Sequence, residues 1–127
     1  MSFKMTKADL KKSALCPPGM HAATLIEVEA AYVKPDNGNT VQKCDFETDA
    51  GYIVPIWFNA KMMASLFEFV QAADKVTFNL ETMEEMDTEL KEYKGKRVTI
   101  SVSHTKNKDG KINAQIDNFY EEGKIPF

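Results

Sequence analysis

The chain has few of the residues from which catalytic and metal sites are usually built. Its 127 residues include two histidines and two cysteines. The cysteines do not form a Cys-x-x-Cys pair, the histidines do not cluster, and no Gly-rich phosphate loop occurs. We therefore expect no metal site, no cofactor and no enzymatic activity. Cys16 and Cys44 are expected to be free thiols, because disulfides are uncommon in a reducing compartment.

Long apolar segments are also absent. No run approaches the roughly 20 residues that span a bilayer, and the lysine-rich residues 1–18 are not followed by the apolar stretch of a secretory signal. Hydrophobic residues make up 43% of the chain and charged residues 28%, which is typical of a soluble globular protein. The sequence predicts one folded domain with no membrane partner, located in the cytoplasm.

The charges are distributed unevenly along the chain. The net charge is −3, but residues 1–12 contain four lysines and one acid, and residues 94–111 contain six basic residues and one acid. Acidic residues gather between positions 81 and 92 and again at 121–122. This distribution says more about partners than the net charge does, because each basic stretch can attract a polyanion.

Alternating apolar and polar side chains predict five β-strands. The segments are residues 20–33, 40–48, 52–58, 96–104 and 111–119. The first is long for one flat strand, so a β-bulge or a strong curl is expected within it. The side chains predicted to point into the core are Ile26, Val28, Ala30, Cys44, Phe46, Val54, Ile56, Phe58, Val98, Ile100, Val102, Ile112, Ala114 and Ile116.

One helix is predicted between the third and fourth strands, over residues 60–74, with Asn59 as its N-cap. Residues 83–93 predict a short acidic helix that stops at Gly95. Five strands with a helix between the third and fourth is the order of the OB-fold, a small, partly open five-stranded barrel. A generic five-stranded α+β sheet fits the hairpin signals as well. The chain then divides into a basic N-terminal arm (1–19), the OB-fold domain (20–119) and an acidic tail (120–127).

A candidate surface for single-stranded nucleic acid follows from the predicted fold. In an OB-fold, oligonucleotides lie across the middle strands, between the loop joining strands one and two and the loop joining strands four and five. Unpaired bases need aromatic faces for stacking, and phosphates need cations. A register slip of one residue would instead bury the outward tryptophan. The residues expected to contact DNA are Lys34, Lys43, Trp57, Lys106 and Lys108, with Lys96, Arg97 and Lys111 as further phosphate contacts.

The last seven residues, Glu121-Glu122-Gly123-Lys124-Ile125-Pro126-Phe127, combine acids with an apolar tip. They resemble the C-terminal tip of bacterial single-stranded DNA-binding proteins, in which Ile-Pro-Phe follows acidic residues. The predicted strand order and the chain length also resemble small phage-encoded OB-fold single-strand binders. The resemblance implies binding of single-stranded DNA with little sequence preference in phage DNA replication, recombination or repair, in the cytoplasm of the host cell.

The resemblance also implies a role for the tip and is compatible with a homodimer. In the similar proteins the tip recruits replication, recombination and repair enzymes. The expected partner-binding residues are therefore Glu121, Glu122, Ile125, Pro126 and Phe127. The aromatic ring can fill an apolar pocket while the terminal carboxylate pairs with a basic residue. Two alternatives stay open: a C-terminus packed against the core, and an OB-fold protein-interaction module that binds no nucleic acid.

Overall fold

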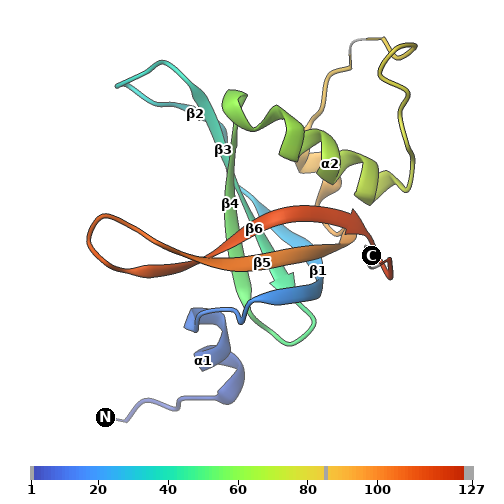
Figure 1. Cartoon of the computed structure of the whole chain (residues 1–127). Helices are drawn as coiled ribbons and strands as arrows, with labels where there is room; N and C mark the ends of the chain where they lie inside the picture. Colours follow the sequence, from blue (N-terminus) through green and yellow to red (C-terminus); the bar gives the residue numbers. More distant parts are fainter. Residues whose placement is uncertain (1, 85, 125–127) are drawn as a thin grey trace.

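The computed structural model describes residues 2–84 and 86–124, and Figure 1 shows their arrangement. Within these residues the protein is mainly β, with six antiparallel strands in one sheet and two α-helices. The strands are β1 (Gly19–Val28), β2 (Tyr32–Val33), β3 (Thr40–Thr48), β4 (Ile53–Asn59), β5 (Arg97–Lys106) and β6 (Ile112–Glu121). The helices are α1 (Lys7–Ser13) and α2 (Met63–Asp74), with 3₁₀ turns η1 (Ala60–Met62) and η2 (Leu90–Tyr93).

The strands form an open sheet that curls around the core. β1 pairs with β3 on one side and with β5 on the other. β3 also pairs with β2 and β4, and β5 pairs with β6. Figure 1 shows β5 and β6 crossing over β3 and β4. In the described part of the chain β4 and β6 are not paired with each other, so the sheet is open and the closure of an OB-fold barrel is not shown.

The first predicted strand divides into β1 and β2, and β1 contains a bulge. Its register against β3 shifts between Leu25 and Glu27, as the length of the segment predicted. The extra residue changes which side chains face inward. Leu25 and Val28 are buried, whereas Ile26 is only partly buried and Ala30 is exposed. The inward positions predicted for Ile26 and Ala30 are therefore wrong.

A second irregularity shapes β6. The register between β5 and β6 shifts so that Asp117 is an extra residue, and Ile116 and Phe119 are both buried. Ile112 is 52% exposed, because it lies at the tip of the β5–β6 hairpin, where the neighbouring residues are also exposed. Its predicted inward position is wrong.

The other inward predictions are confirmed, and the core is rich in aromatic rings. Phe46, Phe58, Phe69 and Phe119 come from β3, β4, α2 and β6, and their ring centroids lie 5.2 to 6.0 Å apart. Burying one such ring stabilises the fold by about 1.5–3 kcal/mol, so this cluster fixes α2 against the sheet. The predicted inward residues found buried or packed against the core are Val28, Cys44, Phe46, Val54, Ile56, Phe58, Val98, Ile100, Val102, Ala114 and Ile116.

The helix α2 forms where the apolar spacing predicted it. Asn59 accepts a hydrogen bond from the amide of Lys61 at 2.9 Å, which caps η1 and leads the chain into α2. Phe69, Ala72 and Ala73 are buried in the core on the face turned to the sheet. The helix ends at Lys75, which adopts a left-handed conformation with φ 57°.

Two other helical segments differ from the prediction. The N-terminal arm contains α1, whose N-cap Thr6 accepts a hydrogen bond from the amide of Asp9 at 3.1 Å. The acidic helix predicted over 83–93 is wrong, because the described residues there are irregular except for η2. Like charges three residues apart, such as Glu84 and Asp87, oppose a helix at that position.

Candidate nucleic-acid interface

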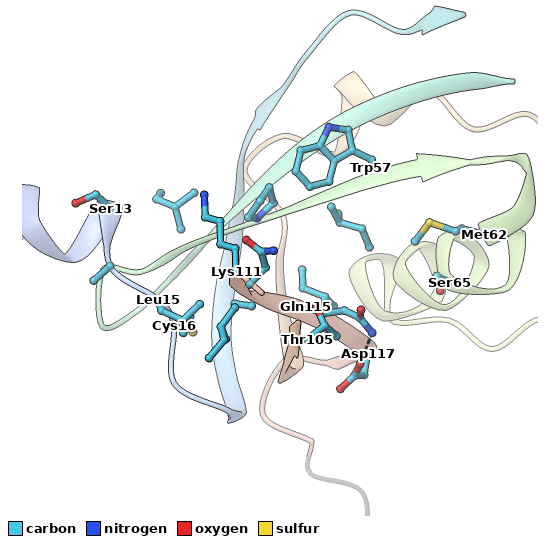
Figure 2. Close-up of a pocket in the computed structure, with 18 of the residues that line it drawn as sticks. Ser13, Leu15, Cys16, Trp57, Met62, Ser65, Thr105, Lys111, Gln115 and Asp117 are labelled. Atoms are coloured by element: carbon cyan, nitrogen blue, oxygen red, sulfur yellow. Dashed lines mark hydrogen bonds between the residues drawn. The ribbon is translucent and has the colours of Figure 1, made fainter. Parts of the chain in front are cut away.

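An open groove of about 900 Å³ lies between β4 and β6, the two strands that do not pair with each other. Residues 13–16 and the start of α2 complete its walls. Figure 2 shows Trp57 and Lys111 on different walls of this groove, with Gln115 between Lys111 and α2. The groove therefore brings together an aromatic ring, a cation and amide groups from segments far apart in the sequence.

The indole of Trp57 stands on the outer face of β4. Its neighbours Ile56 and Phe58 point into the core, and Trp57 is 46% exposed, as the alternation predicted. In the ladder Trp57 lies directly opposite Lys43 of β3. The ring is thus displayed by a strand whose other face is fixed by the core.

Lys43 covers part of this indole. Its Nζ lies 5.5 Å from the centre of the Trp57 ring, 3.4 Å from a carboxylate oxygen of Glu29 and 3.8 Å from one of Asp45. An ammonium over an aromatic face is attracted by the ring, and the two carboxylates hold it there. Lys43 is therefore beside the stacking surface, but its charge is shared with two acids.

The tip of the β5–β6 hairpin carries three of the predicted lysines. Lys106, Lys108 and Lys111 are all exposed, and Lys111 also lines the groove. The turn is shaped by Asn107, whose side-chain oxygen accepts hydrogen bonds from the amides of Asp109 and Lys111 at 3.0 and 2.9 Å. This turn places three ammonium groups next to one end of the groove.

Lys34 lies on the other predicted loop, the turn between β2 and β3. It is exposed, and its amide donates to the carbonyl of Asn39 at 2.9 Å. In Figure 1 this turn and the β5–β6 hairpin extend to the same side of the molecule, away from α2 and the segment that follows it. Lys34 does not line the groove itself.

Lys96 and Arg97 are not brought to the groove. They lie at the opposite end of β5 from Lys106, about 30 Å away at the usual rise per residue. The Arg97 guanidinium donates to both carboxylate oxygens of Asp49 at 3.0 and 2.9 Å and to Glu122 at 2.8 Å. The hydrogen bonds to Arg97 lower the pKa of Asp49, and the two acids raise that of Arg97.

Two histidines hold the linker that forms one wall of the groove. His21 Nε2 lies 2.8 Å from the carbonyl oxygen of Pro17, and His104 Nε2 lies 2.7 Å from that of Cys16. These hydrogen bonds tie the segment between α1 and β1 to β1 and β5. The histidines therefore have a structural role here.

The groove also contains side-chain amides that were not predicted from the sequence. Asn59, Asn113 and Gln115 line it, and each carries donors and acceptors suited to base edges. Gln115 donates to Asp117 at 2.9 Å. Strand alternation could have identified Asn113 and Gln115. They alternate with the inward residues Ala114 and Ile116, so both point outward from β6 before the bulge at Asp117.

The predicted partner-binding acids are engaged within the fold. Glu121 belongs to β6 and lies 2.9 Å from Lys124 Nζ, and Glu122 pairs with Arg97. Ile125, Pro126 and Phe127 lie outside the described residues. The strand therefore extends two residues into the segment predicted as a tail.

Both cysteine thiols lie inside the fold. Cys16 and Cys44 are free and buried, and desolvation raises the pKa of both thiols, that of Cys44 to about 12. Among residues 2–84 and 86–124, no group of three or more His, Cys, Asp or Glu could hold a metal ion. The same residues contain no helix that is both long and apolar enough to cross a membrane.

The groove and the hairpin tip beside it offer three kinds of contact. The indole can stack on flat rings, the lysines can pair with phosphates, and the side-chain amides can hydrogen-bond to the polar edges of bases. These are the contacts that a flexible, unstacked polynucleotide offers. No protein-family model matches the chain, and no curated protein matches it by sequence.

Proposed function

We propose that the protein binds single-stranded DNA with little sequence preference along the groove between β4 and β6. The observation that carries this proposal is the indole of Trp57, which is 46% exposed and lies in the same groove as Lys111. An exposed tryptophan on a rigid strand is a stacking platform for any base, because every base has a π-face.

The strand pairing supports this assignment. β1 pairs with β3 and β5, β3 with β4, and β5 with β6, while α2 lies between β4 and β5 in the chain. This is the strand order of an OB-fold, with β2 as an added two-residue strand, and we infer that the protein is a partly open member of that fold class. In OB-folds, oligonucleotides bind across the corresponding strands, between the corresponding loops.

The lysines supply the electrostatic part of binding. Lys106, Lys108 and Lys111 contact phosphates at one end of the groove, and Lys34 extends the cationic surface from the β2–β3 turn. Lys43 exchanges Glu29 and Asp45 for a phosphate when DNA binds. Lys96 and Arg97 are at most secondary contacts, because Arg97 is already paired with two acids.

The biological setting follows from the resemblance of the C-terminal tip. We propose that Ile125, Pro126 and Phe127 recruit an enzyme of DNA replication, recombination or repair in a phage-infected cell. The apolar tripeptide and its terminal carboxylate fit a pocket with a basic rim on that enzyme.

A protein-interaction module without nucleic-acid binding is the second candidate. The ion pairs favour it, because Lys43 and Arg97 are each held by two acids and contribute little free positive charge. On this alternative, Trp57 and the groove would bind a polypeptide.

Titration with oligo-dT separates the two candidates. Trp57 is the only tryptophan, so stacking is expected to quench its fluorescence, and the affinity is expected to fall steeply as salt rises. Replacing Trp57 with Leu should weaken binding of a dye-labelled oligo-dT by roughly 5- to 150-fold, as the loss of one stacked base predicts. The Trp57→Phe variant keeps a π-face and should retain most of the affinity. An unquenched tryptophan and the absence of salt-dependent binding would favour the interaction module.

A further inference from the structure

A second groove, apolar in character, lies between α2 and the irregular segment that follows it. Its volume is about 520 Å³. It uses a different face of α2 from the first groove, which is lined by Met62 and Ser65 of that region. Leu80, Met63 and Met86 are 72%, 55% and 43% exposed. We call it the methionine groove, and its main lining residues are Met63, Phe67, Val70, Leu80, Met83 and Met86.

The wall of the methionine groove is held in place by specific contacts. The ring of Phe78 stacks on that of Phe67 with centroids 5.7 Å apart. The amide of Phe78 donates to the side-chain oxygen of Gln71 at 2.9 Å. These contacts fix the returning chain beside α2 instead of letting it cover the groove, so an apolar surface stays open to solvent.

The rim of this groove is acidic. Glu81, Glu84, Asp87 and Glu89 are exposed, and Asp87 also lines the groove. None of the four forms an ion pair within the part of the chain that the structure describes. The sequence has no basic residue between positions 76 and 90. A fitting occupant therefore combines apolar side chains with positive charge.

The N-terminal arm of the chain has this combination. Phe3 is 85% exposed, Met5 76% and Leu10 56%, and α1 has no buried residue. Lys4, Lys7 and Lys12 lie among them, and all three are exposed. Several large apolar side chains exposed together on one short segment commonly mark an interaction site.

We propose that the arm of one molecule docks in the methionine groove of a second copy. Phe3 and Met5 enter the groove, and the neighbouring lysines face its acidic rim. The sizes are compatible, since an apolar cavity of about 150 Å³ holds a benzene ring and the groove measures about 520 Å³. Methionine-lined surfaces adapt to the shape of such an occupant.

The occupant comes from another molecule because α1 and the segment that follows α2 lie at opposite ends of the molecule (Figure 1). α1 is anchored at its own end by Lys11, whose Nζ donates to the carbonyl of Ala50 at 3.0 Å and lies 5.7 Å from the centre of the Tyr52 ring. A contact between two different surfaces is head-to-tail, so it can repeat from molecule to molecule.

Two variants test this arrangement in the absence of DNA, so the outcome does not depend on the proposed function. The arm variant is Phe3→Glu with Met5→Glu, and the groove variant is Leu80→Lys with Met86→Lys. In sedimentation velocity the unmodified protein is expected to self-associate with rising concentration. Each variant alone should associate at least about tenfold more weakly.

The mixture of the two variants gives the decisive result. The arm variant keeps an intact groove and the groove variant keeps an intact arm, so together they should form a 1:1 complex that grows no further. Because all four positions are exposed, melting temperatures should match that of the unmodified protein. Val33→Lys, at a position 61% exposed and away from both surfaces, is the matched control and should leave association unchanged.

Three outcomes would overturn the proposal. One is an unmodified protein that stays monomeric at all concentrations tested. The second is a mixture that stays monomeric although the unmodified protein associates, since this would indicate a symmetric interface or a different contact. The third is unchanged association of either variant alone.

Discussion

Arg97 joins four parts of the chain at one end of the sheet. It belongs to β5 and hydrogen-bonds to Thr24 of β1 at 3.0 Å, to Asp49 after β3 and to Glu122 after β6. A guanidinium that donates to both oxygens of one carboxylate is a strong and directional contact. The positive charge of Arg97 therefore stabilises the fold and is already paired, so it is not available to bind a phosphate group.

The stabilising effect of Arg97 should depend on pH. The pKa of Asp49 is lowered in the folded state by its hydrogen bonds to Arg97. Stability from a lowered carboxyl pKa is present above the unfolded value, about 3.9, and is lost as pH falls through the folded value. The Arg97→Ala variant should therefore melt a few degrees below the unmodified protein near neutral pH, and the difference should shrink below about pH 4.

Thermal melts from acidic to neutral pH would check this expectation. Lys96→Ala is the matched control, because it removes an exposed neighbouring cation and should leave the melting temperature unchanged. A gap between Arg97→Ala and the unmodified protein that stays constant down to pH 2 would contradict the assignment.

Single residues show which parts of the fold and of the candidate site can be predicted from the sequence. The outward position of Trp57 follows from alternation within one strand. The position of Ile26 does not, because the bulge next to it reverses the phase of the pattern. The partners of Arg97 lie 25, 48 and 73 positions away in the sequence, so no local sequence pattern predicts these contacts.

At the scale of elements, the β5–β6 hairpin is the main cationic feature beside the groove. It extends beyond the core, so its lysines are exposed and the turn at Asn107 sets their spacing. A rigid two-stranded hairpin can track a phosphate backbone, whereas single surface lysines act only as scattered charges.

Replacing Lys106, Lys108 and Lys111 with Ala should flatten the salt dependence of oligo-dT binding. Each phosphate contact contributes about 0.7 to the slope of log affinity against log salt for single strands, so the slope should fall by up to about 2. The matched control replaces Lys91, Lys94 and Lys96, which changes the net charge equally but lies at the far end of β5. An equal decrease of the salt-dependence slope in both triple variants would show that only the net charge matters and not the position of the lysines.

The helices and strands differ in how clearly the sequence of each one predicts its structure. The strands and α2 carry sustained apolar periods and were predicted close to their observed positions. α1 has seven residues and no buried side chain, so no apolar stripe marks it. The helix predicted after α2 is wrong: Met83, Met86 and Leu90 are spaced like a helix face, but repulsion between the neighbouring acids opposes a helix there.

At the scale of the whole molecule, the open sheet leaves one groove between its free edges and a second groove on another face of α2. Strand order could be predicted from hairpin and turn signals along the chain. Closure of the sheet could not, because it depends on whether β4 and β6 meet, and their contact involves residues more than fifty positions apart.

The C-terminal tip should be dispensable for folding and for DNA binding. Deleting residues 125–127 is expected to leave the melting temperature unchanged, because β6 and its ion pairs end before the deletion. The affinity for oligo-dT should stay equal or rise, because the three neutral residues supply none of the proposed DNA contacts and a shortened tail competes less with DNA for the lysines. A large drop in melting temperature would instead indicate that the tip packs against the core.

The position of Lys43 over the indole has one more consequence. On the proposed function, an arriving nucleotide displaces the Lys43 side chain that already rests on the ring, and the Lys43 ammonium then moves away from Glu29 and Asp45. When the nucleotide departs, those carboxylates draw the lysine back and help to clear the ring. Binding at this site would then be an exchange that reverses readily, which suits the proposed role of coating a strand along which an enzyme must travel.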